Sequence, residues 1–216
     1  MTAAVVVLAA GASSRLGSPK ALADLGGRSA LERLTGAALT VSGGEPVRVV
    51  VGAHAAEIPA ALPALEGVEW IVCDDWRLGR TASLRTAART IGPGRDIVVA
   101  PVDVPLVAAD TFGRLARAWT TAGAPASGWL APFVETASLE SKSTPTGSRA
   151  RFGHPVVLGA DLVRGLEALA EDAPLRALRE RAAPLLSVPV RDAAILDDLD
   201  TPDDLEALQR RFERQG

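Results

Sequence analysis

The sequence has little of several residue types, and each shortage excludes a class of protein. Cys73 is the only cysteine among 216 residues, which excludes an internal disulfide framework and a cysteine-rich zinc site. We expect this thiol to be buried as a small apolar side chain. No apolar run approaches the roughly 18 residues needed to cross a bilayer, so we expect no membrane partner. The net charge of −3, without a basic stripe, argues against nucleic acid as a partner.

The amino-terminal run MTAAVVVLAAGASS lacks the positively charged residues that begin a secretory signal peptide. We expect it to be a strand of the mature protein, and we expect the protein to be cytoplasmic. Hydrophobic residues make up 48% of the chain and charged residues 23%, which allows a sizeable core and argues against disorder. The length, without a visible linker or repeat, predicts a single domain over residues 1–216.

Segments with the pattern of buried strands alternate with helical segments. We expect strands at 3–10, 47–51, 68–73, 96–102, 129–133, 154–159 and 185–191. We expect helices up to residue 181 and at the end of the chain, the clearest being 29–40, 55–62, 81–91 and 110–121. This alternation predicts an α/β fold with a doubly wound, mostly parallel, Rossmann-like sheet and helices on both faces. Residues 134–153 are polar and lack periodicity, which predicts a long loop.

The stretch VVVLAAGASSRLGSPKAL, residues 5–22, joins the first strand to the first helix. Sheets of this class bind ligands at the carboxyl ends of their strands, where this loop lies. Gly11 allows a ligand to approach the backbone, and Arg15 and Lys20 add two cations, a combination that suits a polyphosphate. The glycine and lysine spacing matches neither the dinucleotide fingerprint nor the P-loop. A surface loop with solvated cations is the alternative.

Five motifs in order along nearly the whole chain resemble those of one family. LAAGASSRLGSPKAL resembles the signature LAAG-x-S-x-R-x-G-x-x-K of the MobA-like nucleotidyltransferases of the molybdenum-cofactor type. DDWRLGRTASLR resembles the family's segment with tryptophan, glycine and serine before a helix, and PVDVP resembles its metal-binding L-x-D-x-P. FGHPVV resembles its GHP motif, and LDDLDTPDDL resembles its closing D-x-DTP-x-DL.

The resemblance implies transfer of a nucleoside monophosphate from an NTP to a phosphorylated acceptor, with release of pyrophosphate and with Mg²⁺ as cofactor. Ala10, which gives LAAG rather than LAGG, favours CTP and a molybdopterin-type acceptor. A molybdoenzyme is a further expected partner. The attacking group is already an anionic phosphate, so the reaction requires no general base.

Two aspartates are the expected metal ligands. Asp103 follows the fourth expected strand between two prolines, where a carboxylate can hold Mg²⁺ against phosphates. The resemblance makes Asp200 the second ligand, with Asp198 as the alternative; a solvated acidic turn is also open.

Local structure explains only part of the acidic tail that contains these residues. Thr201 is a typical helix N-cap, and the helix dipole favours Asp203 and Asp204 in the first turn. Asp197, Asp198 and Asp200 are left without a local role.

The expected nucleotide-binding residues come from the first loop and from the start of the helix at 81–91. Lys20 and Arg15 are expected to stabilise charge on the α-phosphoryl group and on the leaving pyrophosphate. Gly79 and Ser83 are expected near the base or ribose. The remaining expected nucleotide contacts are Leu8, Ala9, Ala10 and Gly11.

Other candidate residues have weaker signals. His154, within GHP, is expected to touch the acceptor, with a packed structural histidine as the alternative. His54 and Trp76 are expected to be structural. Arg85 and Arg89 are expected to form a solvated basic face.

Two departures from the family pattern fall on the acceptor side. The segment 134–153 is long and is expected to overhang that side, and EDAPLR at 171–176 stands where the family has GD-x-GAR. Because fold does not settle function, three other functions are open: a sugar-phosphate or alditol-phosphate nucleotidyltransferase, an NAD(P)H-dependent oxidoreductase on the same scaffold, and a silent nucleotide-binding partner of a molybdoenzyme. Asp103, Asp200 and Lys20 together argue against the last.

Overall fold

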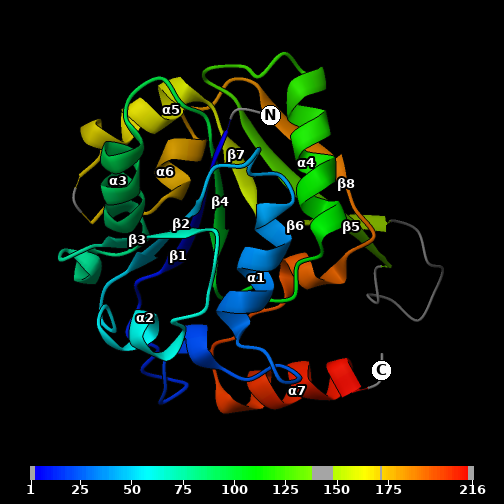
Figure 1. Ribbon diagram of the computed structural model, residues 1–216. Coiled ribbons are helices and arrows are strands. Elements are labelled where there is room, and N and C mark those ends of the chain that lie inside the picture. The colour runs from blue at the N-terminus through cyan, green and yellow to red at the C-terminus, as the bar shows by residue number, and fades with distance from the viewer. Residues whose placement is uncertain (1–2, 138–147, 171, 214–216) are drawn as a thin grey trace.

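One twisted sheet runs through the molecule, and its strands are not ordered as in the sequence (Figure 1). A computed structural model describes residues 3–137, 148–170 and 172–213. The strand order is β3-β2-β1-β4-β7-β5-β6, with β8 paired to β5. The first four strands in this order form the parallel half of a Rossmann-like sheet, so the predicted α/β class is confirmed.

The parallel half is built from strands that alternate with helices. The strands are β1 (Ala4–Ala9), β2 (Val47–Val51), β3 (Val68–Val72) and β4 (Ile97–Pro101). The helices are α1 (Ala30–Leu39), α2 (Glu57–Ala61), α3 (Arg80–Ile91) and α4 (Ala109–Thr121), with short 3₁₀ helices η1 (Lys20–Leu22) and η2 (Trp76–Leu78). Helix α1 begins at a capping box between Ser29 and Glu32, which satisfies backbone N–H groups at its first turn.

The second half of the chain extends the sheet with strands of mixed direction. These are β5 (Trp129–Ala137), β6 (Ser148–Phe152), β7 (Val156–Leu158) and β8 (Leu185–Pro189). Strand β7 is antiparallel to both β4 and β5, whereas β8 is parallel to β5. The helices are α5 (Ala160–Gly165), η3 (Leu166–Ala168), α6 (Arg176–Arg179), η4 (Ala193–Leu196) and α7 (Pro202–Glu213). Among the described residues, no helix has the length and apolar character needed to cross a membrane.

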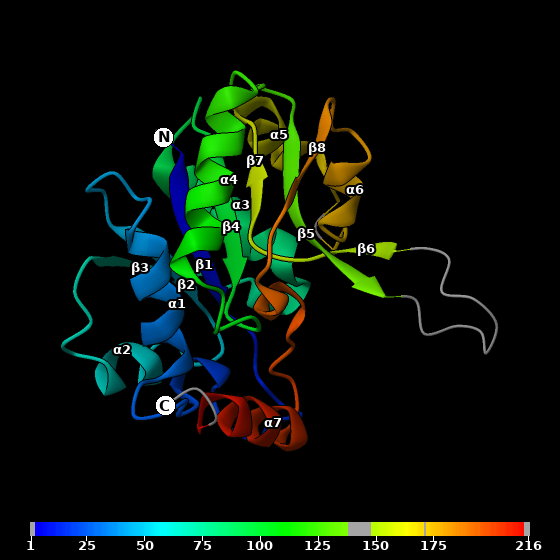
Figure 2. The ribbon, with the colours of Figure 1, turned by 90° about the vertical axis from the view of Figure 1, so that its right-hand side faces the viewer.

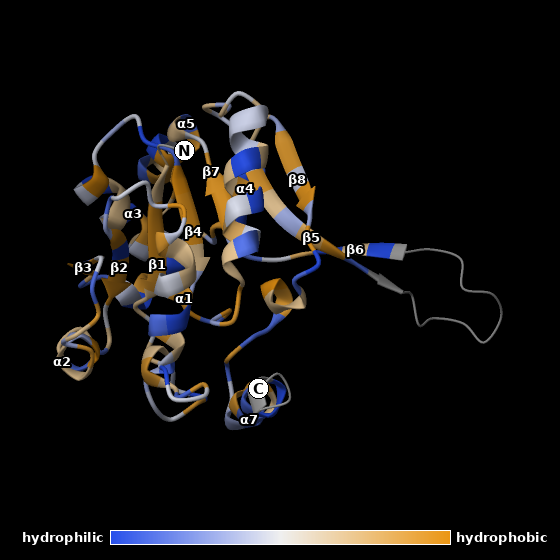
Figure 3. Cartoon of the chain, turned by 45° about the vertical axis from the view of Figure 1, so that its right-hand side comes forward, coloured by the Kyte–Doolittle hydropathy of each residue, from blue (hydrophilic) through white to orange (hydrophobic). Residues whose placement is uncertain are grey.

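Alternate residues of β1 belong to two separate cores, as expected for a strand covered on both faces. Figure 3 shows that the central strands of the sheet are mostly hydrophobic. Val5 and Val7 pack with residues of α1 and α4, such as Leu34. Val6 and Leu8 pack on the opposite face with residues of α3, α5 and α6. Cys73 is buried in this second core, as predicted.

The segment 134–153 is not a loop at its two ends. Strand β5 continues to Ala137 and pairs with β6 in antiparallel register, and Phe133 contacts Phe152 with ring centroids 5.7 Å apart. Figure 2 shows these strands extending from the body of the molecule. Because this segment is rich in polar residues, its sequence pattern did not indicate these strands. Residues 138–147 lie outside the described residues, so the expectation that this segment overhangs the acceptor side stays a prediction.

The carboxyl ends of β1 and β4 lie at the lower end of the sheet in Figure 1, near α2 and α7. The two strands are adjacent and parallel, so the segments that follow them emerge side by side. This arrangement positions the site.

Candidate active site

A cavity of about 260 Å³ opens at the carboxyl ends of β1 and β4. We call it the charged cavity. It is lined by every residue predicted to bind nucleotide or metal, namely Leu8, Ala9, Ala10, Gly11, Arg15, Lys20, Gly79, Ser83, Asp103 and Asp200. The fold therefore brings together residues from distant parts of the sequence.

The loop after β1 folds tightly around Ser13. Its carbonyl accepts hydrogen bonds from the N–H groups of Leu16 at 3.0 Å and Gly17 at 3.1 Å, and its hydroxyl accepts one from the N–H of Lys20 at 3.1 Å. Leu16 is buried and anchors the loop to the core. These contacts fix the backbone from which Arg15 and Lys20 extend.

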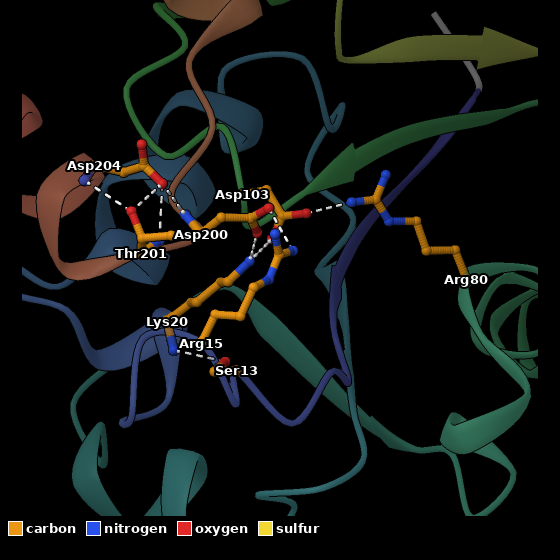
Figure 4. A network of polar contacts seen from close by, with 8 residues as sticks. All are labelled: Ser13, Arg15, Lys20, Arg80, Asp103, Asp200, Thr201 and Asp204. Atoms are coloured by element: carbon orange, nitrogen blue, oxygen red, sulfur yellow. Dashed lines mark hydrogen bonds and ion pairs between the residues drawn. The ribbon is translucent and has the colours of Figure 1, made fainter.

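The Lys20 ammonium joins the two predicted metal ligands (Figure 4). Its Nζ donates to Oδ1 of Asp103 at 3.0 Å and to Oδ1 of Asp200. Because both Oδ1 atoms are hydrogen-bonded to the same Nζ, they lie within about 6 Å of each other. The side chains of Lys20 and Asp103 are only 13% and 16% exposed, so their attraction is weakly screened by water.

An arginine holds the second oxygen of each aspartate. Arg15 Nη2 donates to Oδ2 of Asp200 at 2.6 Å, and Arg80 Nη2 donates to Oδ2 of Asp103. Arg80 was not among the predicted site residues. Its signal in the sequence is its position directly after Gly79, at the first residue of a helix that begins in the site.

The acids of the tail titrate differently. The hydrogen bond from Lys20, followed by the charges of Lys20 and Arg15, holds the pKa of Asp200 below its ordinary value. Partial desolvation, followed by the charges of Asp200 and Asp103, raises the pKa of Asp198. Asp198 therefore lies within the field of both acids, while Asp200 is the one that pairs with Lys20.

The first turn of α7 positions Asp200. Asp204 Oδ2 accepts hydrogen bonds from the N–H and the hydroxyl of Thr201, both at 2.8 Å, and from the N–H of Asp200 at 3.1 Å. The structural role predicted for Thr201 and Asp204 is confirmed.

Two further contacts tie the tail to the body. The N–H of Leu199 donates to the carbonyl oxygen of Asp103 at 2.8 Å, which places the tail beside the end of β4. Asp197 pairs with Arg211 of α7. Asp197 therefore has a structural partner that its neighbours in sequence did not reveal.

The paired carboxylates of Asp103 and Asp200 suit a divalent cation. The Lys20 ammonium between them shows that this position favours positive charge. The described residues contain no group of three or more His, Cys, Asp or Glu arranged to hold a metal. Mg²⁺ typically takes one or two carboxylates and completes its shell with phosphates and water, so these two acids fit it when a phosphate is bound with it.

Gly11 and Gly79 line the charged cavity, and the structure favours glycine at the two positions for different reasons. A Cβ built on Gly11 would meet no protein atom within 4 Å, and Gly11 is not among the glycines with positive φ. Neither packing nor backbone conformation requires glycine there, so the missing side chain leaves space in the cavity. Gly79 has φ of 103°, a conformation that favours glycine.

His54 and Trp76 make packing and hydrogen-bond contacts that fit the structural role predicted for them, and both also line the charged cavity. His54 Nε2 lies 3.2 Å from the carbonyl oxygen of Ala12, and its Nδ1 lies 2.9 Å from Glu57 Oε2. Trp76 packs on Gly52, where a Cβ would lie 2.5 Å from the Trp76 Cβ.

His154 lines a neighbouring cavity rather than the charged cavity. Its backbone N–H donates to the carbonyl oxygen of Ile195 at 3.1 Å. The buried ring Nδ1 has no hydrogen-bond partner among the described residues. Burial, followed by the charge of Arg80, lowers the pKa of His154 to about 4. The imidazole is therefore neutral at pH 7, and its predicted contact with an acceptor stays a prediction.

The expectation of a solvated basic face on α3 is wrong for Arg85, which bonds to backbone carbonyls, whereas Arg89 is exposed as expected and pairs with a surface acid. Arg85 donates to the carbonyl oxygens of Leu166 at 3.0 Å and Leu169 at 3.1 Å, and Arg89 pairs with both carboxylate oxygens of Glu167 at 2.7 Å. These arginines fasten α3 to the segment after α5. Their partners lie far away in sequence, so no local pattern could indicate them.

Known proteins resemble this chain in sequence and in fold. The profile of the MobA-like NTP transferase domain matches residues 5–185. Nicotine blue oxidoreductase of Paenarthrobacter nicotinovorans is 33% identical over 158 residues, which make up 73% of this chain and 71% of that protein.

Solved structures share the fold over nearly the full length. Rv0371c of Mycobacterium tuberculosis H37Rv is 26% identical, with 97% of this chain and 99% of that chain covered and a TM-score of 0.75. A structure of that protein in complex with manganese is 24% identical, with the same coverage and a TM-score of 0.72. Molybdopterin-guanine dinucleotide biosynthesis protein A of Archaeoglobus fulgidus is 20% identical, with 97% and 98% covered and a TM-score of 0.66.

Proposed function

Because the chain belongs to the MobA-like NTP transferase family and is a nucleotidyltransferase, we propose that it moves CMP from CTP to a phosphorylated acceptor of the molybdopterin type. The observation that carries this proposal is the contact of Lys20 with both Asp103 and Asp200 at the end of β1 and β4. A molybdoenzyme is the proposed recipient of the product.

In the proposed reaction, a phosphate oxygen of the acceptor attacks the α-phosphorus of CTP. A new P–O bond forms, the bond between the α-phosphorus and the bridging oxygen breaks, and pyrophosphate leaves with that electron pair. Negative charge grows on the α-phosphoryl oxygens and on the leaving group. We assign Lys20 and Arg15 to stabilise this charge, since fixed cations in a partly dry cavity are effective there.

We assign Asp103 and Asp200 to hold Mg²⁺. When bound, this cation would neutralise part of the phosphate charge. The manganese complex of the mycobacterial relative supports a divalent cation. To receive a triphosphate, Lys20 must exchange its carboxylate partners for phosphate oxygens. A cation that takes over the carboxylates makes this exchange easier, so metal and nucleotide should bind cooperatively.

The choice of CTP rests on Ala10 of the LAAG motif, and Ala10 lines the charged cavity. We assign the backbone from Leu8 to Gly11, with Gly79 and Ser83, to the nucleoside. Open space above Gly11 supports this assignment, because a base or ribose needs close approach to the backbone.

A second candidate function is favoured by one observation, the 33% identity to nicotine blue oxidoreductase. An oxidoreductase on this scaffold would bind NAD(P)H and release no pyrophosphate. It would also leave the two aspartates without a role in the reaction.

Pyrophosphate release tests the proposal. The protein is incubated with Mg²⁺ and each NTP in turn, with and without molybdopterin. We expect release with CTP that depends on the acceptor, lost in Asp200→Ala and kept in Asp203→Ala, because Asp203 is an exposed acid of the same tail. NADPH oxidation without pyrophosphate release would contradict the proposal.

A further inference from the structure

Arg15, Lys20 and Arg80 line the charged cavity, and the proposed reaction gives no role to Arg80. Arg15 and Lys20 extend from the loop after β1. Arg80 instead reaches Asp103 from the start of α3, on another side of the site (Figure 4). Its guanidinium therefore lies beside the position proposed for the triphosphate, on a different element from the two assigned cations.

Each carboxylate of the site has a side-chain cation on both of its oxygens. Lys20 contacts one oxygen of Asp103 and one oxygen of Asp200. The second oxygens accept from Arg80 and Arg15, respectively. A divalent cation binds through carboxylate oxygens, so it must displace side-chain cations before it can occupy this site. In the free protein, the side chains therefore compete with the metal.

The position of Arg80 in its helix is electrostatically unfavourable without an anion. Arg80 is the first residue of α3, where the helix dipole disfavours a positive charge. The first turn of α3 contains no acidic residue, and no side chain caps it. Among the described residues, Asp103 is the one acid that forms an ion pair with Arg80. A metal that takes over Asp103 would therefore leave this guanidinium in need of another anion.

The two cations that hold Asp103 differ in exposure. The side chain of Lys20 is 13% exposed, whereas that of Arg80 is 56% exposed. Water screens an exposed ion pair, so such a pair contributes little free energy and is easily broken. Arg80 is therefore the partner that can leave Asp103 most readily.

A phosphate oxygen is a suitable new partner for Arg80. The bond to Asp103 uses Nη2, which leaves the other N–H groups of the guanidinium fork for phosphate oxygens. Arg80 lines both the charged cavity and the neighbouring cavity that contains His154, so its side chain borders open space on two sides. A small movement of this exposed side chain can bring it to a nucleotide in the charged cavity.

Resting on the proposed function, we propose that Arg80 is an exchangeable counter-ion of the active site. In the free protein it holds Asp103 and opposes the binding of a divalent cation. When the cation and the nucleotide are both present, it leaves Asp103 and donates to a phosphate oxygen of the nucleotide. Arg80 thereby weakens binding of the metal alone and strengthens binding of the nucleotide with the metal.

Binding of Mn²⁺ to the full chain without nucleotide tests the first half of this inference. Electron paramagnetic resonance measures the free Mn²⁺. We expect Arg80→Ala to bind Mn²⁺ about three- to fivefold more tightly than the wild type, because the metal then displaces one exposed cation fewer. Unchanged or weaker Mn²⁺ binding in Arg80→Ala, or Mn²⁺ binding in neither protein, would overturn the inference.

Calorimetric titration of CTP at saturating Mn²⁺ tests the second half. We expect Arg80→Ala to bind CTP about tenfold more weakly, as is typical when a charged hydrogen bond is lost. The two expected changes have opposite signs, whereas a variant that merely distorts the site would weaken both affinities. CTP binding as tight as that of the wild type would also overturn the inference.

Two further variants separate the charge of Arg80 from other effects. Arg80→Lys keeps the charge and should bind Mn²⁺ within about twofold of the wild type. Arg89→Ala removes another exposed arginine of α3, which pairs with Glu167 outside the charged cavity, and should change neither affinity. Mn²⁺ binding in Arg80→Lys or Arg89→Ala as tight as in Arg80→Ala would contradict a role for the charge at this position.

The wild type separates the two possible failures. If it binds CTP with Mn²⁺ while Arg80→Ala shows neither change, the role of Arg80 is wrong and the proposed function stands. If the wild type binds no CTP with Mn²⁺, the proposed function fails as well.

Discussion

The two neighbouring cavities differ in how their charged groups are arranged. In the charged cavity, Lys20 and Arg15 are already bonded to Asp103 and Asp200. The neighbouring cavity of about 420 Å³, here the apolar cavity, is lined mostly by hydrocarbon. Of its exposed arginines, Arg80 is bonded to Asp103, whereas Arg176 and Arg179 have no ion pair with a described residue. The first arrangement requires an exchange of ion pairs when a ligand arrives, whereas the second offers preformed surface. We therefore expect the first cavity to depend on a cofactor cation and the second to depend on ligand shape.

The largest expected effect is that of Lys20→Ala. The change removes a cation that contacts both aspartates and leaves two nearby carboxylates facing each other. We expect kcat/KM for pyrophosphate release to fall about 10³-fold, in the range found when a stabilising donor is removed from an active site. Arg114→Ala on the surface of α4 is the control. A decrease of less than about twofold in Lys20→Ala would remove the main difference between the cavities.

The next effect concerns the apolar cavity, where burial lowers the pKa of His154 to about 4 from an ordinary 6.5. The unfolded chain binds the proton first as pH falls, so the folded state loses stability between pH 6.5 and pH 4 and is most stable above this window. We expect the free energy of unfolding to fall by roughly 2–3 kcal/mol more in the wild type than in His154→Gln between pH 7 and pH 4. Denaturant unfolding at both pH values measures this difference. Identical pH profiles would show that burial does not lower the pKa of His154.

A smaller effect distinguishes the two glycines of the charged cavity, since Gly11 leaves space for a ligand and Gly79 has a backbone conformation that favours glycine. Gly11→Ala should keep its stability, because nothing lies within 4 Å of the new Cβ, yet it should weaken CTP binding about tenfold. Gly79→Ala places a side chain at φ of 103° and should lower the free energy of unfolding by about 1 kcal/mol. Thermal unfolding and CTP titration of both variants check this. Destabilisation of Gly11→Ala with intact CTP binding would contradict the assignment of Gly11.

The smallest effect is expected outside both cavities. Arg89 pairs with Glu167 on the surface, far from the lining residues of the charged cavity. Exposed pairs contribute little to stability. We expect Arg89→Ala to leave pyrophosphate release unchanged and to shift the melting temperature only slightly. A large loss of activity would mean that α3 transmits strain to Gly79 and Arg80.

The two cavities also differ in how far the sequence predicts them. The parallel strands and the residues of the charged cavity follow from short motifs, because a loop at a strand's carboxyl end has a fixed place in this fold. Lys20 and Asp103 could therefore be identified from the sequence alone, and adjacent strands bring them together. Asp200 required the resemblance, since its approach depends on the hydrogen bond from Leu199 to Asp103.

The features that the sequence did not predict depend on contacts between distant segments. Arg80 is one of several arginines on α3, and only the fold distinguishes it from Arg85, which bonds to carbonyl groups after α5. The pairing of residues 134–137 with β6 was missed because both segments contain several polar residues, although the strand at 129–133 was predicted. The apolar cavity has no local signal, because its walls come from six separate stretches of chain: Leu8, residues 78–81, residues 99–101, Trp129, His154 and residues 172–179.

The affinity for CTP with and without Mn²⁺ tests the central claim most directly, since the claim is that Lys20, Asp103 and Asp200 form one site for a triphosphate and a divalent cation. We predict that Mn²⁺ tightens CTP binding at least about tenfold in the wild type and in Asp203→Ala, but not in Asp200→Ala. The same tightening in Asp200→Ala would contradict the account.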